Sequence, residues 1–62
     1  MELTQRYQAY RDGHQRGTAD RSFQYTSRYA SVILATESAY QQWYARGYRD
    51  GNNGLPFRFS EL

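Results

Sequence analysis

The segment Tyr10-x-x-Gly13-His14-x-x-Gly17 is echoed later in the chain by Tyr44-x-x-Gly47-Tyr48-x-x-Gly51. In both segments an aromatic residue precedes a glycine by three positions, and a second ring follows that glycine directly. On a helix these positions lie on one face. Because glycine has no side chain, another helix or a flat ligand can approach closely at the paired glycines. The two segments therefore predict either a close helix–helix contact or a shallow groove bordered by rings.

Helical spacing extends outward from both segments. A first helix is predicted over about residues 4–17 with Thr4 as its N-cap, because Leu3, Tyr7, Tyr10 and His14 recur at spacings of four, three and four and so share one helical face. A second, longer pattern starts near Tyr29 and ends at Gly51-Asn52-Asn53-Gly54, which is a strong stop signal. A break near Thr36 would divide this second pattern and give three helices in total.

The chain is therefore predicted to be all-α, with its main helices forming an antiparallel helical hairpin that self-associates. All of residues 1–62 form one small domain, in which residues 55–62 are an irregular tail with Phe57 and Phe59 tucked onto the helices. A chain of this length buries only about 60% of its unfolded surface. It has no Cys, and 11 of its residues are Tyr, Phe or Trp. Because a buried Tyr hydroxyl needs a partner, we expect the missing stabilisation to come from a second copy or a ligand.

The basic residues are all arginine: eight Arg and no Lys, with a formal net charge of +2. Arginine interleaved with tyrosine is typical of surfaces that bind phosphate and stack on rings. The alternative is that these arginines pair with the six acidic residues at the surface. The candidate polyanion or nucleotide groove is bordered by Arg11, His14, Arg16, Arg46, Tyr48 and Arg49. The candidate interface row is Tyr29, Ile33, Tyr40, Trp43 and Tyr44.

Catalytic and metal chemistry find little support in the chain. His14 is the sole histidine, and none of the serines lies in a Gly-x-Ser-x-Gly elbow. We therefore predict that the protein is not an enzyme and has no catalytic residue, no metal site and no cofactor. The longest apolar run, Val32-Ile33-Leu34-Ala35, is far shorter than a membrane span, and the start lacks the layout of a signal peptide. We expect a soluble cytoplasmic protein with no membrane association.

Two blocks of the chain resemble the ribosome modulation factor family of small bacterial proteins. The first runs from Gly13 through His14-Gln15-Arg16-Gly17 to Arg21-Ser22, and the second is Trp43-Tyr44-Ala45-Arg46-Gly47-Tyr48-Arg49-Asp50-Gly51. The resemblance implies two short helices joined by a linker, and binding to the small ribosomal subunit that favours inactive ribosome dimers. It also implies that Arg16, Arg21, Arg46 and Arg49 contact the polyanion, with Tyr25 as a loop aromatic.

Three functions stay open at this stage. The first is a ribosome- or RNA-associated modulator that uses Arg for phosphates and Tyr or Trp for stacking. The second is a small oligomeric phage-type protein that sequesters a phosphate-bearing nucleotide signal between subunits. The third is an inhibitor that presents its aromatic helix face to a host protein, since Trp and Tyr dominate the binding energy of many interfaces. The family-like blocks favour the first of these.

Overall fold

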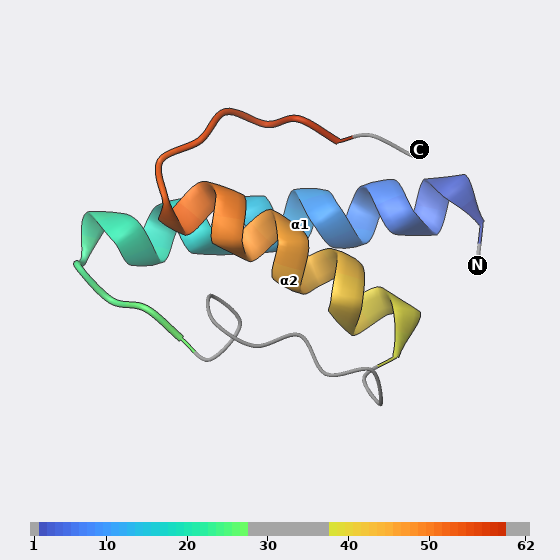
Figure 1. Ribbon diagram of the computed structural model, residues 1–62, viewed down its shortest axis with the longest axis horizontal. Coiled ribbons are helices and arrows are strands. Elements are labelled where there is room, and N and C mark those ends of the chain that lie inside the picture. The colour runs from blue at the N-terminus through green and yellow to red at the C-terminus, as the bar shows by residue number, and fades with distance from the viewer. Residues whose placement is uncertain (1, 28–37, 60–62) are drawn as a thin grey trace.

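The computed structural model describes residues 2–27 and 38–59. Two helices make up most of this part of the chain, α1 (Leu3–Ser22) and α2 (Ala39–Asn52), and they pack along each other (Figure 1). The described residues contain no strand. The prediction of an all-α fold with two packed helices is therefore confirmed. Self-association of the helix pair stays a prediction.

Each helix begins at a capping box, and the cap of α1 differs from the expected one. The cap of α1 is Glu2 rather than Thr4, and its backbone N–H donates to the Gln5 side chain at 3.2 Å. The cap of α2 is Ser38, whose Oγ accepts the Gln41 N–H at 3.2 Å. The Gln41 side chain in turn accepts a hydrogen bond from the Ser38 backbone N–H at 3.1 Å, which completes a capping box. Thr36 lies outside the described residues.

The expected antiparallel hairpin is wrong, because α1 and α2 run in the same direction (Figure 1). Contacts advance together along both helices: Gly13 lies against the backbone of Tyr44, and Gly17 lies against the backbone of Tyr48. The long connection allows this direction. Residues 23–38 can extend over roughly 50 Å, whereas the 20 residues of α1 span about 30 Å. The chain can therefore return to the starting end of α1 before α2 begins.

The glycines set the distance between the helices. Gly13 faces the carbonyl oxygen of Tyr44, and Gly47 reciprocally faces the carbonyl oxygen of Tyr10. Gly17 and Gly51 repeat the arrangement one turn further along. At each of the four positions a Cβ atom would overlap backbone of the other helix. The helices are thus in backbone contact, an arrangement in which Cα–H groups point at carbonyl oxygens. The close contact predicted from the two echoed segments lies within one chain.

Two tyrosines form the centre of the small core. Tyr10 and Tyr48 are buried together with Ala9 and Ala45. The Tyr48 hydroxyl donates to Asp20 of α1 at 2.5 Å, and the Tyr10 hydroxyl donates to Asp50 of α2. Each helix therefore has one tyrosine whose hydroxyl donates a hydrogen bond to a carboxylate of the other helix. These bonds supply the partners that buried tyrosine hydroxyls require.

The tail folds back over the helix pair after Gly54. Residues 55–59 are neither helix nor strand, and they run alongside α1 toward its N-terminal end (Figure 1). The Phe57 ring packs edge-on against Tyr10 with centroids 5.2 Å apart, and the Phe59 ring lies 5.4 Å from that of Trp43. The tail thus covers one side of the core and links it to the start of α2.

Candidate functional site

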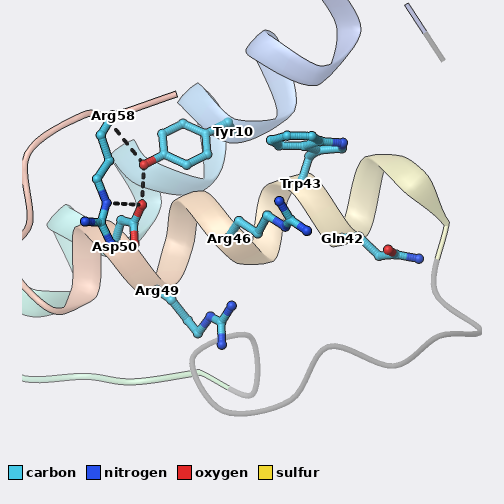
Figure 2. A pocket seen from close by; sticks show the side chains of 7 residues that line it. All are labelled: Tyr10, Gln42, Trp43, Arg46, Arg49, Asp50 and Arg58. Atoms are coloured by element: carbon cyan, nitrogen blue, oxygen red, sulfur yellow. Dashed lines mark hydrogen bonds and ion pairs between the residues drawn. The ribbon is translucent and has the colours of Figure 1, made fainter. Parts of the chain in front are cut away.

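A cavity of about 500 Å³ opens where α2, Tyr10 of α1 and the tail meet (Figure 2). We call it the Trp43 cavity, and its lining consists of Tyr10, Gln42, Trp43, Arg46, Arg49, Asp50 and Arg58. The five residues from α2 occupy positions 42, 43, 46, 49 and 50, a helical spacing that puts them on one face. The volume lies within the range of about 300–1,000 Å³ found for ligand pockets.

One end of the cavity is an ordered polar cluster. Asp50 binds the Arg58 guanidinium through both carboxylate oxygens, each at 3.3 Å, and accepts a hydrogen bond from the Tyr10 hydroxyl. The Arg58 backbone N–H donates to that same hydroxyl at 3.4 Å (Figure 2). Arg58 is therefore anchored to both helices, although it belongs to the tail.

These contacts shift the ionisation of the groups involved. Burial raises the pKa of Tyr10 to about 12, and the hydrogen bond to Asp50 acts in the same direction. Burial alone would raise the pKa of Asp50, but the hydrogen bonds from Arg58 and Tyr10 outweigh it and hold that pKa below its usual value. Tyr10 stays a protonated donor and Asp50 a charged acceptor at neutral pH.

We expect the Tyr10–Asp50 bond to make stability pH-dependent at both extremes. The raised pKa of Tyr10 gives a contribution that is complete below pH 10 and lost as pH rises through about 12. The lowered pKa of Asp50 gives a contribution that is present above about pH 4 and lost on further acidification. Tyr10→Phe should therefore lose stability less steeply than the wild type above pH 10. Urea unfolding followed by circular dichroism at stepped pH measures this slope.

Tyr7→Phe is the matched control, since it removes an exposed hydroxyl from the same helix. Its alkaline slope should equal that of the wild type. Equal slopes for the wild type and Tyr10→Phe would contradict the assignment.

The other end of the cavity carries uncompensated positive charge. Arg46 and Arg49 have no carboxylate within ion-pair distance among residues 2–27 and 38–59. The Arg46 guanidinium lies 4.8 Å from the centre of the Trp43 ring, over its face. The lining has three arginines and one carboxylate, which gives it a net charge of +2. Because Asp50 neutralises Arg58, this net charge lies at Arg46 and Arg49. An electropositive cavity with an aromatic wall suits an anionic ligand that carries a ring.

Of the predicted groove residues, the structure gathers only Arg46 and Arg49 in this cavity. Tyr48 is buried, so its ring is closed to a ligand. His14 is a packing residue: its Nε2 lies 2.9 Å from the Leu55 carbonyl oxygen, and its ring meets Phe57 edge-on.

The remaining predicted residues lie elsewhere. Arg11 pairs with Asp12 at 3.4 Å, and Arg16 pairs with Asp20 at 3.2 Å, as the alternative of surface pairing predicted. Arg21 and Tyr25 line a separate hollow beside Asn52.

The predicted interface row is also divided. Trp43 belongs to the cavity, whereas Tyr40 and Tyr44 stack on each other with centroids 6.3 Å apart. The Tyr40 hydroxyl donates to Asp12 at 3.2 Å. Tyr29 and Ile33 lie outside the described residues.

Sequence reasoning missed Gln42, Asp50, Tyr10 and Arg58 as lining residues. Gln42 had a signal, because it precedes Arg46 by four and Arg49 by seven positions and so shares their face. Arg58 had none in helical spacing, since it reaches the cavity only through the path of the tail.

In the part of the chain that the structure describes, neither helix is apolar enough over sufficient length to cross a membrane. Within the same residues, His, Asp and Glu do not gather in threes that could hold a metal ion. No family model, no curated protein and no solved structure matches the chain.

Proposed function

We propose that this chain is a small non-enzymatic RNA-binding protein that associates with the ribosome, in the manner of the ribosome modulation factor family. The observation that carries the proposal is the pair Arg46 and Arg49, which have no carboxylate partner in the described chain and lie beside the Trp43 ring. Both arginines and the tryptophan lie in the second of the two family-like blocks.

The geometry of α2 suits a phosphate backbone. Side chains three apart on a helix have Cβ atoms about 5–6 Å apart, so Arg46 and Arg49 can bind phosphates of one strand together. Arginine presents a planar fork that matches phosphate oxygens. The sequence pI of about 9.2 favours an anionic partner as well. The structural use of His14 in packing is consistent with a binding role rather than a catalytic one.

The test is binding to small ribosomal subunits and to a fragment of their RNA at stepped salt concentrations. Each arginine that contacts a phosphate of a single strand contributes about 0.7 to the slope of log K against log salt. Arg49→Gln should therefore weaken binding several-fold and reduce the slope by about 0.7. Fluorescence anisotropy of labelled RNA measures both quantities.

Arg11→Gln is the matched control, because it removes the same charge from an exposed site where Asp12 already compensates it. Its slope should stay close to that of the wild type. Equal losses for Arg11→Gln and Arg49→Gln would mean that the cavity has no special role. Absence of binding to subunits and RNA at low salt would refute the proposed function itself.

A further inference from the structure

The Trp43 ring has two contacts of different kinds. The Arg46 guanidinium lies over its face at 4.8 Å from the ring centre. The Phe59 ring of the tail approaches it at 5.4 Å with a tilt of 45°. Phe59 belongs to the same tail segment as Arg58, which Asp50 anchors. The anchored tail therefore packs against the indole through Phe59, whereas the Arg46 contact is made by an exposed side chain.

We propose that the Trp43 cavity takes one unpaired base of a single RNA strand, stacked on the indole face that Arg46 covers in the free protein. This inference rests on the proposed function and names the form of RNA that the site selects. On binding, Arg46 moves from the ring to a phosphate next to the stacked base, and Arg49 binds a neighbouring phosphate. Single-stranded RNA is then preferred over duplex RNA.

The exchange at the indole face is energetically favourable. A base stacked on an aromatic ring is worth about two to three times as much as an exposed cation–π contact. The displaced Arg46 also gains a charge-assisted hydrogen bond to phosphate. Because Phe59 of the anchored tail already packs against the indole, little further ordering of the protein is needed when the base binds.

A base inside a duplex cannot stack on the indole for a geometric reason. Bases inside a helix are stacked on their neighbours and offer no free face, and unstacking them costs additional free energy. The cavity volume of about 500 Å³ is also that of a pocket for a small ring and its phosphates rather than of a groove for a helix. A duplex can still contact Arg46 and Arg49 through phosphates, but it gains no stacking.

The sole tryptophan of the chain makes the proposal directly measurable. The probes are an oligoadenylate, the duplex of that strand with oligouridylate, and free AMP. We expect oligoadenylate to quench the Trp43 fluorescence and to bind about tenfold tighter than the duplex, the ratio that base stacking predicts. AMP should quench only at much higher concentration, because it lacks the second phosphate that Arg49 binds.

Trp43→Leu should reduce the affinity for labelled oligoadenylate to that for the duplex while leaving the salt slope unchanged, since stacking carries no charge. Trp43→Tyr keeps a ring and should restore most of the affinity, which separates stacking from any loss of folding. Tyr40→Leu, which removes an exposed ring of the same helix outside the cavity, should have no effect.

The outcomes separate this inference from the function on which it rests. Equal affinity for single strand and duplex, with unchanged Trp43 fluorescence, overturns base stacking but leaves RNA binding intact. AMP binding as tight as oligoadenylate binding overturns the choice of an RNA strand in favour of a free nucleotide. Failure of both RNA forms to bind overturns the proposed function and the inference together.

Discussion

Gly47→Ala should unfold the protein or leave it with only a small fraction of its stability. A chain of 62 residues has a free energy of unfolding of about 3–9 kcal/mol, from typical values per residue. The new Cβ would overlap the carbonyl oxygen of Tyr10 and the backbone N–H of His14. Both obstacles are backbone of α1, so no change of rotamer relieves them and the helices must separate. Loss of helical circular dichroism and of the urea unfolding transition measures the effect.

The sign of the stability change in Gly47→Ala distinguishes the helix–helix contact from helix propensity. In an unobstructed helix the change from glycine to alanine adds about 1 kcal/mol of stability, whereas here we expect it to remove most of the total. Gln15→Ala is the control, because it places alanine on the exposed face of α1 and should leave stability within about 0.5 kcal/mol of the wild type. A Gly47→Ala protein as stable as the wild type would disprove the backbone contact between α1 and α2.

The helix pair and its glycine contact were predictable from the sequence because both are expressed in local spacing. The echoed segments placed glycines on one face of each helix, and the structure pairs them reciprocally. The relative direction of the helices was not predictable in this way. Glycine spacing is the same in parallel and antiparallel pairs, so it does not determine the relative direction of the two helices.

The C-terminal end of α1 also differs from the prediction because of a tertiary contact. The sequence predicts a helix end at about residue 17, where Gly17 costs about 1 kcal/mol relative to Ala inside a helix. In the structure α1 continues to Ser22, because the approach that Gly17 permits against Tyr48 outweighs its poor propensity. A tertiary contact thus overrides a local preference.

The candidate site also combines residues that local spacing reveals with residues that only the tertiary fold brings there. Trp43, Arg46 and Arg49 could be found from the sequence, since they lie on one helix and one block of residues identifies them. Trp43 was nevertheless expected at an interface rather than with the arginines. Arg58 could not be found, because its position depends on the ion pair with Asp50 that folds the tail back. Tyr48 was predicted at the groove since its helix face is correct, but that face is turned into the core.

Tyr48→Ala should cost about 3–5 kcal/mol, the range for removal of a large buried ring, and so should leave little or no folded protein. The Tyr48 side chain is 1% exposed, and its hydroxyl joins Asp20 of α1 at 2.5 Å and accepts the Ser27 N–H at 2.9 Å. Tyr40→Ala is the matched control on the same helix, with a ring that is 44% exposed, and should cost about 1 kcal/mol or less. Chemical unfolding of the two variants measures the difference.

Tyr48→Phe separates the ring from the hydroxyl. The ring stays in place, but the buried Asp20 carboxylate loses a donor and, among the described residues, keeps the Arg16 guanidinium at 3.2 Å. We expect a loss of about 1–3 kcal/mol, because a buried acceptor is left without its partner. Asp20→Ala in the Tyr48→Phe background should then cost much less than Asp20→Ala alone, since the hydrogen bond whose acceptor it removes is already gone. Additive losses in this double-mutant cycle would mean that the two groups do not interact. In that case the core would depend on the glycine contact, on ring packing and on the Tyr10–Asp50 bond.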